Sequence, residues 1–164
     1  MQAIVAVDKN WGIGYENNLL FNVPEDMRFF KEKTTGKLVV MGRKTFLSLP
    51  GQKPLPNRKN IVLSRDKNFS PQGVLVLSSV EDLFEYLQAY KSDDIFIIGG
   101  QSIYETMLPY CSRIYVTHFE SESPSDKFFP PLNCHSEWER TFTSEKVHSK
   151  GLTFTFNTYE KVQD

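Results

Sequence analysis

The chain has 164 residues, of which 40% are hydrophobic and 24% charged, and its formal net charge is −1. This length suits one domain with a substantial core, so we expect residues 1–164 to form a single domain. The near-neutral charge argues against a nucleic-acid surface, which needs a basic excess. No apolar run approaches the length of a membrane span, and the N-terminus lacks a signal-peptide pattern, so we expect no membrane partner.

The cysteines and histidines favour neither a disulfide framework nor a metal site. Cys111 and Cys134 stand alone without metal-ligand spacing, which predicts a reducing, cytoplasmic location. The three histidines are scattered, and each is interpreted as a surface or hydrogen-bonded residue rather than a metal ligand. We therefore expect no bound metal.

The first elements are a strand and a loop. Residues 1–7, MQAIVAV, form a continuous apolar run that suits a strand covered on both faces of a sheet. Residues 12–18 contain two glycines and two asparagines and predict a loop. Leu19, Leu20 and Phe21 follow, and three apolar residues would be wasted on a solvated surface. A mobile loop with apolar residues that leads into a helix predicts a lid over a pocket.

The helix after this loop carries the most informative acid of the chain. Pro24 fits the first helical position, and the pattern continues to Lys33. Met27 and Phe30 form an apolar stripe, and Asp26 lies on its border. One interpretation is a helix-start charge that faces water. The other is a poorly solvated carboxylate, which must find a partner, bind a proton or do chemistry.

Two further strand ends, each followed by cationic residues, point to a ligand site. Strand 38–41 runs through Gly42 into a helix start with Arg43, Lys44 and Thr45, an arrangement that binds phosphate but is also common in other α/β proteins. Ser64 and Arg65 follow strand 61–63, where open α/β sheets place ligands.

Strand 95–98 runs into Gly99-Gly100 and a further helix, although the chain has no G-x-G-x-x-G fingerprint. Strands are also expected at 74–77 and 114–119, with a polar loop at 121–127. Residues 141–147 and 152–162 flank a Ser-Lys-Gly turn and predict a half-buried antiparallel hairpin. The fold class is therefore α/β.

Five motifs, in order along nearly the whole chain, resemble those of the dihydrofolate reductases. They are IGYENNLLFNVPED (13–26), VVMGRKTFLSL (39–49), PLPNRKNIVLSR (54–65), IGGQSIY (98–104) and FFP (128–130). Two positions depart from the family pattern, because Leu20 replaces a proline and Phe21 a tryptophan. The resemblance implies a central, mainly parallel sheet with flanking helices and an antiparallel C-terminal hairpin.

The resemblance implies NADPH-dependent reduction of 7,8-dihydrofolate to 5,6,7,8-tetrahydrofolate in a monomer that also binds folate analogues. Asp26 would bind the pterin with Thr117, Arg58 would grip the α-carboxylate of the glutamate tail, and Asp126 would brace the lid through backbone N–H groups. The resemblance also implies a cis bond between the paired glycines. Phenylalanine at position 21 lacks the donor with which the family's tryptophan helps to anchor a water. The open alternatives are a reductase of another heterocycle and a nucleotide-binding protein without catalysis.

Carried over residue by residue, the resemblance implies three sets of site residues. The catalytic set is Leu19, Phe21, Asp26 and Tyr104. The substrate set is Ile4, Val5, Asp26, Met27, Phe30, Leu49, Leu55, Arg58, Ile98 and Thr117. The NADPH set is Ala6, Ile13, Gly14, Asn17, Gly42, Arg43, Lys44, Thr45, Leu63, Ser64, Arg65, Gly99, Gly100, Gln101, Ser102, Ile103 and Tyr104.

Overall fold

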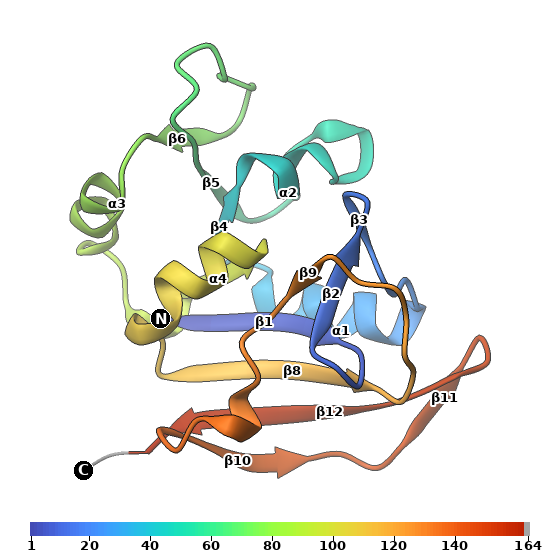
Figure 1. The fold of residues 1–164 in the computed structure, drawn as a ribbon. Helices are drawn as coiled ribbons and strands as arrows, with labels where there is room; N and C mark the ends of the chain where they lie inside the picture. The colour runs from blue at the N-terminus through green and yellow to red at the C-terminus, as the bar shows by residue number, and fades with distance from the viewer. Residues whose placement is uncertain (163–164) are drawn as a thin grey trace.

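A large twisted sheet forms the centre of the computed structural model, which describes residues 1–162 (Figure 1). Its strands are β1 (Gln2–Val7), β4 (Leu38–Gly42), β5 (Lys59–Leu63), β6 (Leu75–Leu77), β7 (Ile95–Gly99), β8 (Arg113–Phe119), β10 (Trp138–Thr143), β11 (Val147–Ser149) and β12 (Leu152–Lys161). Over residues 1–162 this sheet has nine strands, eight of them in the order β10-β12-β8-β1-β7-β4-β5-β6, with β11 paired to β12. The six strands from β8 to β6 pair in parallel, and β10, β11 and β12 make the antiparallel edge, as expected.

The C-terminal edge is more broken than a simple hairpin. The strand predicted at 141–147 begins earlier, at Trp138, stops at Thr143 and resumes as β11. The pairing with β12 shifts register between Arg140 and Phe142. Beyond it, Ser144 Oγ accepts the backbone N–H of Phe156 at 2.8 Å. A side chain therefore replaces a backbone partner at this point, which interrupts the strand.

Helices cover both faces of the sheet: α1 (Pro24–Thr34), α2 (Arg43–Leu47), α3 (Val80–Leu87) and α4 (Gln101–Met107). Short 3₁₀ turns occupy Pro50–Gln52, Ser92–Asp94, Leu108–Tyr110 and Leu132–Cys134. Successive strand residues point to opposite faces. Val40 and its neighbours on one face pack with α3 and α4, whereas Val39 and Met41 on the other pack with Phe29 of α1 and Phe46 of α2. Figure 1 shows α4 in front of the sheet and α1 behind it.

The segment predicted to be a loop at 12–18 is a hairpin, and this prediction was wrong. Strands β2 (Gly12–Tyr15) and β3 (Asn18–Leu19) pair through a two-residue turn at Glu16 and Asn17, whose φ angles are 50° and 67°. Two positive φ angles are typical of the tight hairpin turn that matches strand twist. Strand β9 (Lys127–Phe128) completes a small sheet in the order β3-β2-β9. The apolar Leu19 is 78% exposed, contrary to expectation.

Helix α1 begins at Pro24 as expected, but its buried stripe differs from the prediction. Phe29 and Phe30 are partly buried against the sheet, whereas Met27 is 57% exposed. Met27 lies one residue after Asp26, which places it at the margin of the buried face rather than on it. None of the helices within residues 1–162 combines the length and apolar character needed to cross a membrane.

Candidate active site

Most of the expected site residues lie on elements that meet near the carboxyl ends of the parallel strands, whereas Leu55 and Arg58 precede the amino end of β5. Their locations are β1 (Ile4, Val5, Ala6), the β2–β3 hairpin (Ile13, Gly14, Asn17, Leu19), the segment before α1 (Phe21), α1 (Asp26, Met27, Phe30), the β4–α2 unit and its following loop (Gly42, Arg43, Lys44, Thr45, Leu49), the β5 region (Leu55, Arg58, Leu63, Ser64, Arg65), the β7–α4 unit (Ile98, Gly99, Gly100, Gln101, Ser102, Ile103, Tyr104) and β8 (Thr117).

The two glycine turns lie against each other. Gly42 at the end of β4 pairs with Leu63, and the adjacent Met41 pairs with Gly99 of β7. A Cβ built on Gly42 would lie 3.2 Å from Ile103 Cγ1, and one built on Gly100 would lie 3.5 Å from Thr45 Oγ1. The starts of α2 and α4 therefore lie close to each other, with a glycine from each strand end at the contact, and such backbone can approach an anion closely.

Cationic side chains border this region. Arg43 and Lys44 lie exposed in the first turn of α2, and Arg65 lies exposed just past the end of β5. Ser64 stands between β5 and Arg65, and its N–H donates to Leu77 O at 2.9 Å, which holds the strand end in place. Glycines at two adjacent strand ends with cations beside them have the chemistry of a dinucleotide phosphate site.

Tyr104 packs on the glycine pair from α4. The Gly99-Gly100 peptide bond is cis, as the resemblance implies, and Gly99 has a φ of 120°. A Cβ at Gly99 would lie 3.2 Å from the Tyr104 ring, so this position favours glycine on two counts. Tyr104 Oη donates to Ile4 O of β1 at 2.7 Å, and burial raises the pKa of its phenol. Tyr104 therefore acts as a neutral hydrogen-bond donor that joins α4 to β1.

Asp26 is not a solvated helix charge. Thr117 Oγ1, on β8, donates to Asp26 Oδ1 at 2.7 Å. Thr117 is buried and pairs with Ala6 of β1, so the acid faces the carboxyl end of the central strands. Burial raises the pKa of Asp26, and the hydrogen bond from Thr117 partly offsets this. The structure thus supports the second interpretation, a poorly solvated carboxylate with one protein partner.

The raised pKa of Asp26 predicts a stability change. The native state binds this proton more tightly than the unfolded chain, so the stabilisation is complete below the unfolded pKa and is lost as pH rises through the native pKa. Asp26→Asn should therefore raise the free energy of unfolding by about 1 kcal/mol at neutral pH, the order of a buried polar group's desolvation penalty. In urea unfolding, the gain should shrink as pH falls toward the unfolded pKa of about 3.9.

An exposed acid in the first turn of α3 provides the matched control. Glu81→Gln removes a favourable helix-start charge, so it should lower stability by about 0.3–1 kcal/mol at neutral pH. If Asp26→Asn behaves in the same way as Glu81→Gln, Asp26 acts only as a helix-start charge and its burial has no energetic effect.

Phe21 is held by a row of contacting phenylalanine rings. It stacks on Phe119 with ring centroids 3.8 Å apart and planes at 6°. Phe119 contacts Phe154 at 4.7 Å, Phe154 contacts Phe156 at 5.7 Å, and Phe156 contacts Phe29 of α1 at 4.5 Å. The row connects the segment before α1 to the C-terminal strands and back to α1. The alternation of phenylalanine along β12 was the only signal for it in the sequence.

Two acids brace the β2–β3 hairpin. Asp126 Oδ2 accepts the Glu16 N–H at 3.1 Å, the contact that the resemblance implies. Asp8, which directly follows β1, is 1% exposed. Its Oδ1 accepts from Gly12 N at 2.8 Å and its Oδ2 from Ser123 N at 3.1 Å. A buried carboxylate that accepts backbone N–H groups fixes where the hairpin leaves β1.

Gln101 connects this hairpin to the glycine turn, a contact that no sequence pattern indicates. Its Oε1 accepts the Phe128 N–H at 2.8 Å, and its Nε2 donates to Glu105 Oε1 at 2.9 Å. Phe128 lies on β9, which pairs with Gly12 of β2. The first residue of α4 therefore holds the third strand of the small sheet.

Arg58 lies at the far end of an apolar row. Phe30, Leu49, Leu55 and Ile98, four of the expected substrate residues, pack partly buried in one cluster. Arg58 Nε donates to Pro56 O at 2.9 Å and its Nη1 to Thr34 Oγ1 at 3.0 Å, with the guanidinium 5.9 Å from the Phe30 ring centroid. Burial lowers the pKa of Arg58. These contacts fix the plane of the guanidinium while leaving its outer N–H groups for a carboxylate.

The described residues include no cluster of histidine, cysteine and acid side chains that could hold a metal ion. His118 instead packs edge-on to Trp11, with ring centroids 4.8 Å apart, and its Nε2 lies 2.9 Å from Tyr159 Oη. Burial lowers the pKa of His118 to about 4, which fits a neutral, hydrogen-bonded residue at neutral pH.

Comparison with known proteins agrees with this geometry. The family model described as dihydrofolate reductase matches residues 1–161. A dihydrofolate reductase of Buchnera aphidicola is 36% identical over 154 residues, covering 94% of this chain and 93% of the relative. One of Staphylococcus aureus (strain Mu50 / ATCC 700699) is 40% identical over 139 residues, covering 85% of this chain and 82% of the relative.

A solved structure agrees over the full fold. The dihydrofolate reductase of Enterococcus faecalis, complexed with NADP(H) and RAB-propyl, matches with a TM-score of 0.88 and 34% identity. The match covers 99% of this chain and 96% of that one. The acid on the first helix, the paired glycines and the full-length match all lead to one conclusion: the chain belongs to the dihydrofolate reductase family.

Proposed function

We propose that this chain is an NADPH-dependent oxidoreductase that reduces 7,8-dihydrofolate to 5,6,7,8-tetrahydrofolate, a carrier in one-carbon metabolism. The observation that carries the proposal is the Asp26–Thr117 pair at one end of the apolar row and the oriented Arg58 at the other. These groups suit the two ends of folate, the pterin and the glutamate tail. A reductase of another heterocycle would have no use for Arg58, and a protein that only binds nucleotides would need neither group.

The residues around the glycine turns fit NADPH. A Cβ on Gly42 would crowd the contact between the β4–α2 and β7–α4 turns, and Arg43 and Arg65 supply positive charge and Ser64 a hydroxyl for the 2′-phosphate. When bound, NADPH supplies the hydride. We assign thirteen further residues to the same NADPH site: Ala6, Ile13, Gly14, Asn17, Lys44, Thr45, Leu63, Gly99, Gly100, Gln101, Ser102, Ile103 and Tyr104.

In the proposed mechanism, the protein makes the pterin a better hydride acceptor. The ring carbon accepts hydride readily only when the adjacent nitrogen is protonated. Anionic Asp26 binds the pterin amino and ring N–H groups and favours the protonated form electrostatically, while Thr117 orients the acid. Asp26 does not reach that nitrogen, so water delivers the proton. The β2–β3 hairpin admits this water when open and excludes solvent when closed.

The other site assignments follow the same logic. In this proposal Phe21 supplies bulk without an N–H donor, so Thr117 and Asp26 are left to hold the water. Leu19 lies on the hairpin that we assign as the lid, and Tyr104 donates to the Ile4 carbonyl of β1. We propose that the exposed Met27 lines the substrate opening.

We further propose a single-domain monomer in a reducing cytoplasm. Both cysteines are free thiols, with Cys111 buried and Cys134 exposed. The apolar row and the two glycine turns come from one chain, so the proposed site needs no second subunit. The same row gives folate analogues with an apolar middle a place to bind.

One assay distinguishes the candidate functions. The absorbance of NADPH should fall only when 7,8-dihydrofolate is added. Consumption with a different pteridine or pyrimidine and not with dihydrofolate would favour the related reductases, and binding of NADPH without consumption by any of these would favour the non-catalytic alternative.

The tail assignment is tested by Arg58→Lys. A point charge replaces a planar fork, so the KM for dihydrofolate should rise about tenfold, the effect of losing one charge-assisted hydrogen bond of roughly 1.5 kcal/mol. A dihydropterin without the glutamate should be reduced equally well by both proteins. If both substrates suffer alike, Arg58 is a structural residue and the folate assignment loses its main discriminator.

A further inference from the structure

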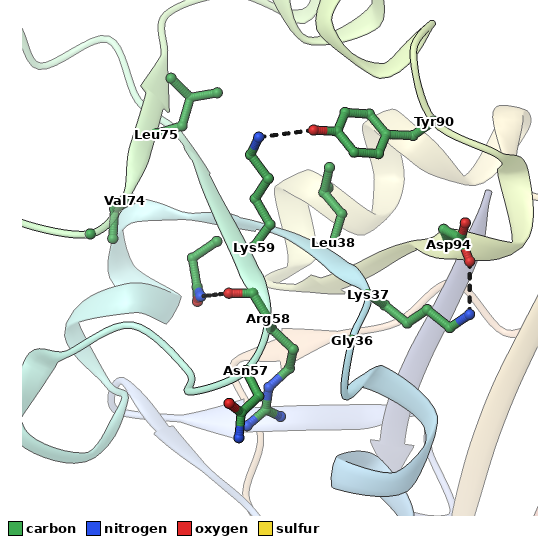
Figure 2. A pocket seen from close by; sticks show the side chains of 12 residues that line it. Gly36, Lys37, Leu38, Asn57, Arg58, Lys59, Val74, Leu75, Tyr90 and Asp94 are labelled. Carbon is green, nitrogen blue, oxygen red and sulfur yellow. Dashed lines mark hydrogen bonds and ion pairs between the residues drawn. The ribbon is translucent and has the colours of Figure 1, made fainter.

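The two ends of the proposed substrate site are built differently. At the tail end, Arg58 borders a pocket of ≈ 950 Å³ beside the amino end of β5 (Figure 2). At the pterin end, burial leaves Asp26 poorly solvated, and the segment that precedes it lies against β8 through a stack of two aromatic rings. The geometry at the end where the hydride arrives therefore depends on packing.

Residues 21–26 join the proposed lid to α1, and both ends of this segment are attached to β8. At one end, Thr117 Oγ1 donates to Asp26 Oδ1 at 2.7 Å. At the other end, the Phe21 ring lies nearly parallel to the Phe119 ring, with centroids 3.8 Å apart and planes at 6°. Thr117 and Phe119 are two residues apart on one strand, so their side chains point to the same face of the sheet. A hydrogen bond and a ring stack thus hold the two ends on one surface.

Phe119 is a fixed platform for this segment. It is 2% exposed, and it pairs in register with Phe154 of β12, whose ring centroid lies 4.7 Å away. Phe154 is itself 0% exposed, so the Phe119 ring is packed against the core of the sheet. Side chains packed at this density stay in one rotamer on average. Phe119 therefore presents a ring face of constant orientation to Phe21.

The segment on this platform has few other contacts to fix it. Within residues 1–162, none of the N–H groups of Phe21, Asn22 and Val23 donates to another backbone group. Val23 is 1% exposed and packs in one cluster with Phe119. Its carbonyl accepts the Met27 N–H at 3.0 Å, which is the first helical hydrogen bond of α1. The packing of the Phe21 and Val23 side chains therefore determines where α1 begins.

Asp26 depends on this packing for its position, because it lies three residues beyond Val23 in the first turn of α1. Thr117 holds Oδ1, but one hydrogen bond leaves the carboxylate free to turn about it. The position of the helix start then decides where the second oxygen lies. Coulomb energy depends on distance, and most strongly in a poorly solvated site. A small displacement of the carboxylate therefore changes how well it favours a protonated ring.

We propose that Phe119 is a positioning residue for the reductase reaction. Its ring holds Phe21, and through Phe21 the start of α1, so that Asp26 keeps its distance from the pterin while the β2–β3 hairpin moves. The inference rests on the proposed function, because it needs a pterin at Asp26. Phe119 acts on the protonation of the bound ring, through Phe21 and Asp26, and takes no part in the transfer of hydride itself.

Phe119→Leu tests the proposal, because leucine stays apolar but has no flat face for Phe21. Single-turnover hydride transfer is measured from acid to base with saturating NADPH and 7,8-dihydrofolate. The midpoint of the decline in base should fall by about 0.7 to 1 pH unit, since a displaced Asp26 raises the pKa of the bound pterin by less. Above the wild-type midpoint, this shift makes the rate about fivefold to tenfold lower. In acid, where both proteins hold a protonated pterin, the two rates should agree within about twofold.

Phe96→Leu is the matched control. Phe96 lies on β7 and is 2% exposed, as is Phe119, so both substitutions remove one buried ring. The Phe96 ring stacks on Tyr115, with centroids 6.2 Å apart, and not on Phe21. Urea unfolding should show comparable losses of stability for the two variants. The midpoint for Phe96→Leu should nevertheless stay within about 0.2 pH unit of that of wild type.

A double-mutant cycle shows whether the two stacked rings act as one unit. Phe21→Leu should give the same shift as Phe119→Leu, and the double mutant should shift no further. Phe119→Met keeps more of the buried volume and should reproduce the shift, so the result does not depend on the folding of one variant.

Three outcomes would overturn the positioning role while leaving the reductase activity intact. They are an equal shift in Phe119→Leu and Phe96→Leu, additive shifts in the double mutant, and a loss of stability in Phe119→Leu with no shift of the midpoint. Wild-type protein that fails to reduce dihydrofolate would instead overturn the proposed function itself.

Discussion

Asp26→Asn should slow hydride transfer at neutral pH by about 10²- to 10³-fold, the order expected when a positioned charge that stabilises a protonated state is removed. Asparagine keeps the size of the side chain and can still accept from Thr117 Oγ1, so the fold and the hydrogen bond should persist. The mutant must use substrate that is already protonated in solution, and this form becomes more abundant as pH falls. Its rate should therefore recover progressively in acid.

Single-turnover measurements from acid to base provide the test. The wild type should stay fast through neutrality and decline in base, as the bound pterin loses its proton. The same substitution is expected to raise stability at neutral pH, and urea unfolding of the mutant then separates a slow rate from a loss of fold. A mutant rate that runs parallel to that of wild type over the whole range would remove Asp26 from the catalytic site.

Replacing Arg43 and Arg65 together by alanine should raise the KM for NADPH by about 10²-fold or more. Each guanidinium can donate charge-assisted hydrogen bonds to the 2′-phosphate, worth roughly 1.5–3 kcal/mol apiece. Both side chains are exposed at neighbouring strand ends and neither packs in the core, so the fold should be unaffected.

NADH, which lacks the 2′-phosphate, serves as the control cofactor. Its KM should change little in the double mutant, so the preference for NADPH should collapse. Equal increases for the two cofactors would show that the arginines act on a part of the dinucleotide that both share, and the assignment of the 2′-phosphate would be wrong.

The sequence predicted those parts of the fold whose signals are local. The apolar runs of β1, β4, β5 and β7 are short and continuous, and each identifies a strand buried on both faces without reference to the rest of the chain. The glycines that end β4 and β7 likewise follow directly on the apolar runs that they terminate. The position of Pro24 was enough to place the start of α1.

What the sequence could not predict depends on partners far apart in the chain. Strand β9 has two residues, and it is a strand only because Gly12 and Gly14 lie beside it. The broken C-terminal edge results from one serine hydroxyl that substitutes for a backbone group. Such contacts have no periodicity to detect, because each involves a single side chain.

The same holds for the candidate site. Asp26 could be singled out from its position at the border of an apolar stripe, but only the pairing of β8 with β1 brings Thr117 to it. Met27 was placed on the wrong side of that border because one position on a helix rotates a side chain by about 100°. The stack of Phe21 on Phe119 joins residues nearly a hundred positions apart, so no local pattern could indicate it.

The hydrogen bond from Phe128 N–H to the Gln101 carboxamide has a thermodynamic consequence. Gln101 opens the helix at the proposed cofactor site, and Phe128 belongs to the sheet that carries the proposed lid. If closing the lid changes the affinity for NADPH by some factor, linkage requires that bound NADPH change the closing equilibrium by the same factor. The effect of lid closure on NADPH affinity and the effect of NADPH on lid closure are then two measurements of one coupling free energy, and Gln101→Ala should reduce both effects by the same factor.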